Sequence, residues 1–251
     1  MKRWLLILAV MLSPVQARAI TAKSWLVASS NNEIIASENQ DSVRSIASIT
    51  KLLLAMTVMD AHQDYSQMLP LSYTIKDRLP TRGTSLSRRQ LLELALVNSD
   101  NRAAQTLCEN YPGGFDACVS AMNKKLQDLG MKNSVVHEPT GLDERNVSTA
   151  VDLMRLVKAA LTYPIILEDS RKTKVEIKVK KKFFIFPQTN RLVGHTQEIL
   201  VTKTGYTRPA GGCIVMVMKT DLGERIVIVL GSKNTHTRIP EAEIISKLPS
   251  H

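Results

Sequence analysis

The sequence predicts an α+β domain whose first and last strands share one antiparallel sheet. Short apolar segments follow residue 20, and strand-like segments return in the last third of the 251-residue chain. Between these two regions, apolar residues recur at three- and four-residue spacing, which is typical of helices. Strands at both ends of a chain with helices between them indicate an α+β fold with an inserted helical block.

Ahead of this domain, the N-terminus has the pattern of a secretory signal peptide. Lys2 and Arg3 are followed by an apolar stretch at residues 4–12 and by the small residues Ala17 and Ala19. The stretch is far shorter than the roughly 20 residues that span a bilayer, which argues against a membrane anchor. We therefore expect a signal peptide that is cleaved after Ala19.

The remaining chain, residues 20–251, is expected to form a single domain with a helical lobe at about residues 45–165. No internal repeat, low-complexity tract or Pro/Gly linker marks a second domain. Loss of Lys2, Arg3 and Arg18 with the leader reduces the formal net charge from +10 to +7. A basic exported protein suits an anionic partner such as a wall polymer or a lipid surface, and no nucleic-acid motif accompanies the charge.

The domain is expected to begin with an antiparallel hairpin and a buried helix. Residues 25–28 and 33–37 are short apolar segments on either side of a polar turn. The next helix, at residues 46–59, is apolar nearly all round, so it should run through the core. Ser87 and Gln90 form a capping box that starts a second helix. Further helices are expected at residues 102–109, 115–129 and about 148–161, with residues 98–101 as an interruption.

The last third of the chain changes to strands. Strand-like segments occupy residues 175–179, 183–186, 199–202, 213–219 and 225–230. A hairpin turn precedes the final strand, and a closing helix follows Thr237. The basic stretch at residues 171–182 alternates lysine with valine and isoleucine, which favours a strand with a solvated lysine face over a dedicated binding patch. Residues 239–251 are too short and too weakly patterned for a surface anchor, so no stable membrane anchor is expected.

The three cysteines leave two arrangements open. Cys108 and Cys118 lie on predicted helices on either side of the turn at residues 111–114, so a disulfide across that turn is geometrically feasible in an oxidising compartment. Three buried thiols, with Cys213 as the third, are the alternative.

The first candidate for chemistry is Ser48, with Lys51 three positions later. Residues at i and i+3 lie on the same face of a helix, so the hydroxyl and the amine can touch. A serine needs a base to become a useful nucleophile, and burial can lower the pKa of a lysine enough to provide one. Alone, a Ser-x-x-Lys pair is a weak signal because it arises often by chance.

Two further segments add weight to this pair. Ser99-Asp100-Asn101 lies at the interruption between helices, where a hydroxyl and an amide can face a cleft, while Asp100 is expected to be structural. Lys203-Thr204-Gly205 follows an apolar strand, and its glycine leaves room for a substrate backbone beside that strand. Ser-x-x-Lys, Ser-Asp-Asn and Lys-Thr-Gly in this order are the signatures of penicillin-binding proteins and class A β-lactamases.

Beyond the motifs, the sequence resembles the D-alanyl-D-alanine endopeptidases among low-molecular-mass penicillin-binding proteins. The resemblance covers nearly all of the chain after the leader and rests on residues 44–51 (RSIASITK), 111–114 (YPGG), 138–142 (EPTGL), 146–150 (NVSTA) and 203–207 (KTGYT). It implies the penicillin-binding-protein/β-lactamase-like transpeptidase fold. It also implies a periplasmic hydrolase that cuts D-alanyl bonds in peptidoglycan cross-links or stem peptides, with β-lactams as covalent inhibitors and with no metal or cofactor.

The resemblance implies a role for each matching residue. Ser48 would attack the D-alanyl carbonyl to form an acyl-enzyme, and Lys51 would take its proton. Ser99 would relay a proton to the leaving amine, and Asn101 would hold Lys51 and the substrate amide. Lys203 would keep the cleft positive, which favours a neutral Lys51 by repulsion between like charges.

The strand that carries the Lys-Thr-Gly motif is expected to bind the substrate. Thr204 and Thr207 would hydrogen-bond a terminal carboxylate, and Gly205 would leave room for the peptide. The backbone N–H groups of Ser48 and Tyr206 would form the oxyanion hole.

Other functions stay open at this point. Larger carboxypeptidase relatives carry an added C-terminal domain and a membrane anchor, and the lack of both here favours the endopeptidase. Class A β-lactamases use a further glutamate followed four residues later by asparagine, whereas Glu138 is followed by Leu142, so covalent inhibition by penicillin is expected instead of rapid hydrolysis. The intact set of motif residues argues against a non-catalytic wall-binding or β-lactam-sensing domain. His137, His195 and His236 lack metal-ligand spacing and are expected on the surface or in loops.

Overall fold

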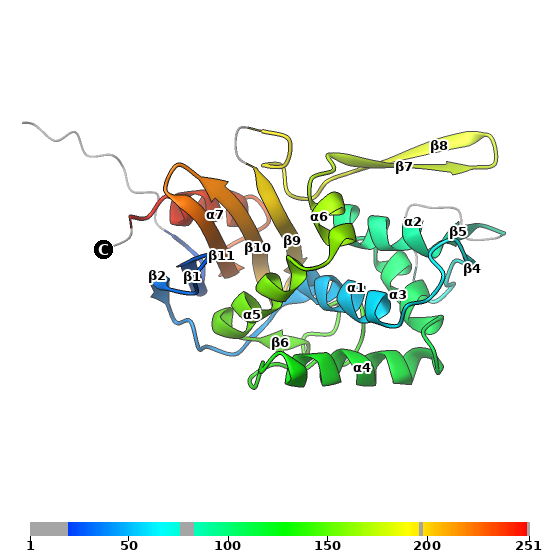
Figure 1. Cartoon of the computed structure of the whole chain (residues 1–251), viewed down its shortest axis with the longest axis horizontal. Coiled ribbons are helices and arrows are strands. Elements are labelled where there is room, and N and C mark those ends of the chain that lie inside the picture. The colour runs from blue at the N-terminus through cyan, green and yellow to red at the C-terminus, as the bar shows by residue number, and fades with distance from the viewer. Residues whose placement is uncertain (1–19, 76–82, 196–197, 250–251) are drawn as a thin grey trace, which may run out of the picture.

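The computed structural model describes residues 20–75, 83–195 and 198–249, and it has the predicted arrangement of a sheet beside a block of helices (Figure 1). The expected signal peptide at residues 1–19 lies outside the described residues. In the described part of the chain, no helix is both long and apolar enough to cross a membrane.

The main sheet has five antiparallel strands in the order β2-β1-β11-β10-β9. Strands β1 (Ser24–Ser29) and β2 (Ile34–Glu38) form the N-terminal hairpin. Strands β9 (Ile199–Thr207), β10 (Gly211–Thr220) and β11 (Gly223–Ser232) come from the end of the chain. Because β1 pairs with β11, the first and last strands share one sheet, as predicted.

Each face of this sheet packs against helices. Successive side chains of a strand point to opposite faces. On β11, Ile226 and Ile228 join the core that includes the helical block, whereas Val227 and Val229 join a second core with α7 (Arg238–Ser246). Near-continuous apolar strands such as β10 and β11 are therefore explained by burial on both sides.

The helical block is built around α1, whose residues 50–59 are all buried, as its uniform apolar character predicts. The capping box of Ser87 and Gln90 starts α2 as expected. A short helix that the pattern did not reveal, α6, begins with proline in its first turn. The helices are η1 (Ala47–Ile49), α1 (Thr50–Asp60), α2 (Arg88–Glu93), the π-helical η2 (Leu94–Asn98), α3 (Asn101–Glu109), α4 (Gly114–Asp128), α5 (Ala150–Ala160) and α6 (Pro164–Ser170).

Three small two-stranded sheets complete the fold. They pair β3 (Arg44–Ser45) with β6 (Val147–Ser148), β4 (Met68–Pro70) with β5 (Ser85–Ser87), and β7 (Lys174–Val179) with β8 (Lys182–Pro187). The β7–β8 hairpin extends away from the body of the molecule (Figure 1). On β7, Val175 and Ile177 are buried while Lys174 and Lys178 are exposed, which confirms the predicted lysine face.

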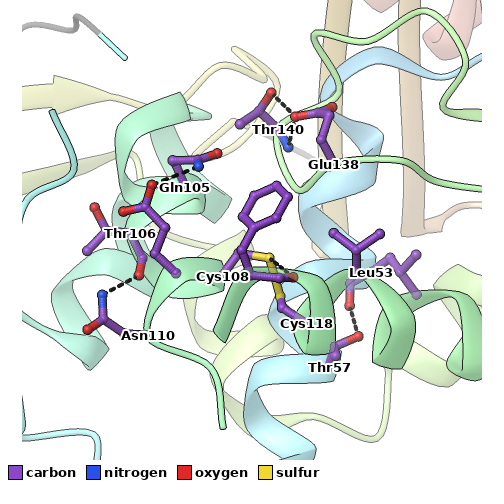
Figure 2. Close-up of a disulfide and its surroundings, with 12 residues drawn as sticks. Leu53, Thr57, Gln105, Thr106, Cys108, Asn110, Cys118, Glu138 and Thr140 are labelled. Atoms are coloured by element: carbon purple, nitrogen blue, oxygen red, sulfur yellow. Dashed lines mark hydrogen bonds between the residues drawn. A yellow bond between two sulfur atoms is a disulfide. The ribbon is translucent and has the colours of Figure 1, made fainter. Parts of the chain in front are cut away.

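A disulfide joins two helices of the block. Cys108 on α3 is bonded to Cys118 on α4, with a Cα–Cα distance of 5.4 Å (Figure 2). Cys213 is a buried free thiol, and burial raises its pKa to about 11. Of the two arrangements that the sequence left open, the structure has the disulfide across the turn.

Candidate active site

Ser48 lies in the short helix η1, at the junction between β3 and the buried helix α1. The residue before it, Ala47, has a left-handed backbone with φ of +47°. Such a conformation is uncommon for a residue with a side chain, and conformations of this kind cluster at functional sites. Ser48 itself is partly exposed, while Ala47 and Ile49 on either side of it are buried.

The Lys51 amine is the centre of the hydrogen-bonded cluster. Its side chain is fully buried, and Nζ lies 2.8 Å from Ser48 Oγ, 2.7 Å from Asn101 Oδ1 and 2.6 Å from the carbonyl oxygen of Thr140. Ser48 Oγ also lies 3.3 Å from the same carbonyl. The contact between hydroxyl and amine that the helical spacing predicted is therefore present.

The Ser99-Asp100-Asn101 segment forms the turn between η2 and α3. Ser99 has a left-handed backbone with φ of +64°, which ends the π-helical segment. Asp100 is the N-cap of α3, and its carboxylate accepts a hydrogen bond from Ala103 N at 2.7 Å. Asp100 is thus structural as expected, and it fixes the first turn of the helix from which Asn101 reaches Lys51.

Lys203 adds a second buried lysine to the cluster. Only 1% of Lys203 is exposed, and its Nζ donates to the carbonyl oxygen of Thr204 at 2.8 Å. Burial lowers the pKa of Lys203 well below its usual value, and the positive charges of Lys51 and Arg238 lower it further. Lys51 and Lys203 therefore lie close enough for the charge of one to disfavour a charge on the other.

Strand β9 runs directly beside the nucleophile. A side chain at Gly205 would lie 2.9 Å from Ser48 N and 3.0 Å from Ile46 O, so this close packing requires a glycine. Arg238, from α7, donates to the carbonyl oxygen of Gly205 at 2.6 Å and holds the strand from its far side. Nothing in the local sequence around Arg238 indicated this contact.

The other predicted substrate-binding residues lie along the same strand. Thr204 is buried, and its hydroxyl contacts that of Thr189 at 2.7 Å. Tyr206 is 46% exposed. Thr207 lies at the end of the strand, where its hydroxyl accepts a hydrogen bond from Ala210 N at 3.2 Å. This hydrogen bond stabilises the turn between β9 and β10.

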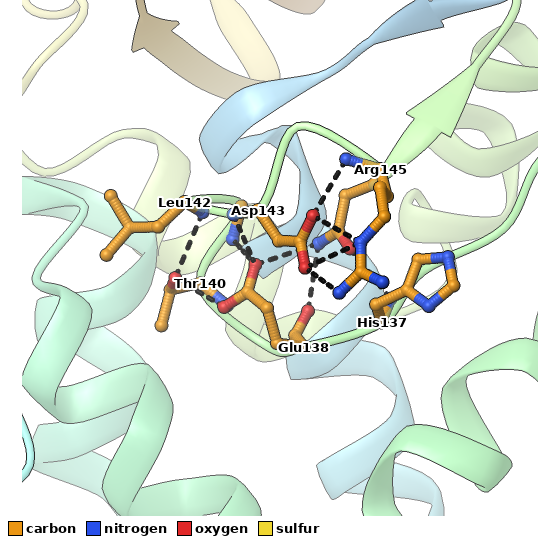
Figure 3. A network of polar contacts seen from close by, with 8 residues as sticks. His137, Glu138, Thr140, Leu142, Asp143 and Arg145 are labelled. Atoms are coloured by element: carbon orange, nitrogen blue, oxygen red, sulfur yellow. Dashed lines mark hydrogen bonds and ion pairs between the residues drawn. The ribbon is translucent and has the colours of Figure 1, made fainter.

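A loop centred on Glu138 completes the site (Figure 3). Glu138 Oε2 accepts from the amide of Thr140 at 2.7 Å and from its hydroxyl at 2.5 Å. Oε1 accepts from Gly141 N at 2.5 Å, from Asn146 Nδ2 at 3.0 Å and from Asp143 N at 3.4 Å. A carboxylate offers about four lone-pair sites, so these five donors occupy it.

The Thr140 carbonyl is a functional group that the sequence did not indicate, because a backbone oxygen has no residue-type signature. The nearest signal was the 138–142 segment, in which an acid precedes a hydroxyl and a glycine. The three histidines are exposed, in line with their expected surface or loop positions. Among the residues that the structure describes, no three His, Cys, Asp or Glu side chains gather as metal ligands do.

Comparison with known proteins gives consistent matches. The Peptidase S11 family model, described as D-alanyl-D-alanine carboxypeptidase, matches residues 11–234. The D-alanyl-D-alanine endopeptidase of Pseudomonas aeruginosa is 37% identical over 238 residues, which cover 91% of this chain and 77% of that protein. The D-alanyl-D-alanine endopeptidase of Escherichia coli is 36% identical over 236 residues, which cover 90% and 76%.

The fold also matches solved structures. Penicillin-binding protein D2 from Listeria monocytogenes, in its cefotaxime-bound form, has a TM-score of 0.81 and 28% sequence identity, over 92% of this chain and 97% of that chain. This match confirms the predicted α+β fold with its inserted helical block.

Proposed function

Since the chain belongs to the D-alanyl-D-alanine carboxypeptidase family of serine peptidases, we propose that it hydrolyses D-alanyl peptide bonds of peptidoglycan as an endopeptidase. The bond we assign is the D-alanyl–meso-diaminopimelate cross-link. The observation that carries the proposal is the 2.8 Å contact between the fully buried Lys51 amine and the Ser48 hydroxyl.

Lys51 has the geometry of a general base. A charged lysine has three N–H donors, whereas the neutral amine has two N–H groups and one lone pair. The oxygens of Asn101 and Thr140 can only accept, so they take N–H groups of Lys51, and the lone pair of the neutral amine can accept the Ser48 proton. Proton transfer from Ser48 Oγ to Lys51 Nζ then accompanies attack on the D-alanyl carbonyl.

Lys203 is proposed to keep Lys51 neutral when substrate is bound. Repulsion within the cluster disfavours two charges, and burial alone disfavours a charge on Lys203. A substrate carboxylate beside Thr204 would stabilise the ammonium form of Lys203, and the repulsion would then favour the neutral amine at Lys51. The free enzyme and the substrate complex therefore differ in which lysine holds the proton.

The remaining roles are proposed from the family resemblance. The backbone N–H groups of Ser48 and Tyr206 are proposed to bind the oxyanion, since β9 runs alongside η1 at Gly205. The new bond joins Ser48 Oγ to the carbonyl carbon, and the C–N bond breaks as Ser99 relays the proton of Lys51 to the departing amine. Water then hydrolyses the ester and restores the Ser48 hydroxyl. Thr204 and Thr207 are assigned to substrate binding.

Of two neighbouring functions, a class A β-lactamase fits the site less well, and a carboxypeptidase fits it equally. A β-lactamase of the class A type needs a glutamate that activates water, and the Glu138 oxygens are already occupied by donors from their own loop. β-Lactams are therefore expected to form a long-lived acyl-enzyme. A carboxypeptidase shares every residue of the mechanism, and only the products distinguish it from an endopeptidase.

We further propose that the protein works in the periplasm after loss of residues 1–19. The basic, apolar and small-residue regions of the N-terminus support export, and peptidoglycan lies outside the cytoplasm. The measurement is the mass of the protein recovered from a periplasmic extract. A chain that stays in the cytoplasm with its N-terminus uncut would refute this part of the proposal.

The central experiment combines labelling with product analysis. Purified protein should be labelled by a fluorescent penicillin, and Ser48→Ala should abolish the label. Ser37→Ala, an exposed serine on β2, is the matched control and should label normally. Digestion of peptidoglycan should convert cross-linked dimers to monomers. Loss of terminal D-alanine alone would identify a carboxypeptidase, and activity that survives in Ser48→Ala would refute the mechanism.

A further inference from the structure

The peptide unit between Thr140 and Gly141 is held at both ends. Its N–H group, on Gly141, donates to Glu138 Oε1 at 2.5 Å. Its carbonyl oxygen, on Thr140, lies 2.6 Å from Lys51 Nζ and 3.3 Å from Ser48 Oγ. Carboxylate, peptide and amine therefore form one chain of hydrogen bonds. Each bond in such a chain polarises the next, and bonds to a charged group are the strongest.

The peptide unit and the amine of this chain are buried, and Glu138 is half-buried. Thr140 is 1% exposed, Gly141 is buried, and Lys51 is fully buried. In a medium of low dielectric constant, a negative charge acts more strongly on a nearby group than it does in water. The carboxylate of Glu138 can therefore affect Lys51 without touching it.

We propose that Glu138 is a positioning residue that orients the Thr140 carbonyl and raises the basicity of Lys51 through the intervening peptide. This inference rests on the proposed role of Lys51 as the base. The negative charge increases electron density on the carbonyl oxygen. That oxygen then stabilises the protonated form of Lys51, which makes the amine a stronger base as it takes the Ser48 proton.

This role differs from that of a glutamate that activates water. The donors that occupy both oxygens of Glu138 all belong to its own loop, and they fix the carboxylate in one orientation. Asn146 also donates to the Glu138 carbonyl oxygen at 2.9 Å and lies 3.2 Å from the Thr50 hydroxyl, which ties the loop to α1. The loop and the helix that carries Lys51 are thus held together.

The test changes the charge of Glu138 with little change in its shape. Glu138→Gln is compared with Glu144→Gln, an exposed glutamate of the same loop. Rapid-mixing kinetics with a β-lactam separate the Kd of the first complex from the rate constant for acylation of Ser48, and the rate constant is measured across a range of pH. The other titratable or charged groups near the cluster, unchanged in every variant, are Lys203 on β9, Arg238 on α7, Asp100 at the start of α3, and His137, Asp143 and Arg145 in the same loop.

We expect Glu138→Gln to lower the acylation rate constant about 10- to 100-fold, because a small displacement of a catalytic group such as the Lys51 amine has an effect of this size. Kd should change little. The acid limb of the pH profile should move to lower pH, because loss of the negative charge lowers the proton affinity of the base. Glu144→Gln should leave both quantities at the wild-type values. A purely structural role would lower the rate without moving the acid limb.

Two outcomes with the Glu138→Gln variant would overturn the proposal. They are a folded Glu138→Gln variant that acylates at the wild-type rate, and one that acylates slowly with an unmoved acid limb. If this variant does not fold, Glu138→Asp takes its place. It keeps the charge but retracts it from Gly141, so acylation should slow with the acid limb near its wild-type position, and an unchanged rate would contradict the proposal. A wild-type protein that is never acylated at Ser48 would instead refute the proposed function.

Discussion

Replacement of Gly141 by alanine should slow acylation of Ser48 about 100-fold while the fold survives. Gly141 has φ of +82°, and a Cβ at this position would lie 1.9 Å from the carbonyl oxygen of Ala47 and 2.8 Å from Ser48 N. Real Cβ atoms essentially never come within 3.0 Å of such an atom, so the backbone on one side has to move by about 1 Å. That backbone carries the nucleophile.

Two costs follow from this geometry. A left-handed backbone costs alanine roughly 1–2 kcal/mol relative to glycine, and the clash adds roughly 1–3 kcal/mol as overpacking does. Displacement of a catalytic group by about 1 Å can reduce a rate about 100-fold. The assay is the rate of labelling by a fluorescent penicillin, with stability followed by thermal melting.

Gly130→Ala is the matched control for this experiment. Gly130 also has a left-handed backbone, with φ of +70°, but nothing lies within 4 Å of an added Cβ. The control should lose roughly 1–2 kcal/mol of stability and keep the wild-type labelling rate. If Gly141→Ala is labelled as fast as Gly130→Ala, then contact with the 138–142 loop does not determine the position of Ser48.

Two further predictions concern Lys203 and the disulfide. Burial lowers the pKa of Lys203 in the folded state. At pH values below that lowered pKa, the buried charge has its full destabilising effect on the fold, and this effect disappears as the pH rises to the ordinary lysine range. Lys203→Met should therefore stabilise the protein by roughly 0.5–2 kcal/mol at neutral pH and by less in alkaline solution, and it should abolish acylation. An equal gain in stability at neutral and alkaline pH, measured by thermal melting, would contradict this prediction. Replacing both Cys108 and Cys118 by serine should lower the free energy of unfolding by roughly 3 kcal/mol, and an unchanged denaturation midpoint would refute that estimate.

Much of the fold could be predicted because its signals are local. The capping box at Ser87 and the alternation in β7 need only neighbouring residues, and both are present in the structure. The short helix α6 (Pro164–Ser170) was missed because seven residues hold fewer than two turns of apolar periodicity before the pattern ends. The disulfide stayed open in the sequence because the spacing of Cys108 and Cys118 does not fix the distance between two helices.

The sequence by itself determined the residue types of the site. The spacing of Ser48 and Lys51 on one predicted helix predicts their contact. The motifs that contain Asn101 and Lys203 indicate which further residues belong to the site. Only the tertiary structure decided what surrounds the amine. The Thr140 carbonyl that meets Lys51 is 89 positions away in the chain, and it is a backbone atom that every residue type carries. Packing of the 138–142 loop against the start of α1 brings that oxygen to the amine, and local periodicity cannot predict such a contact.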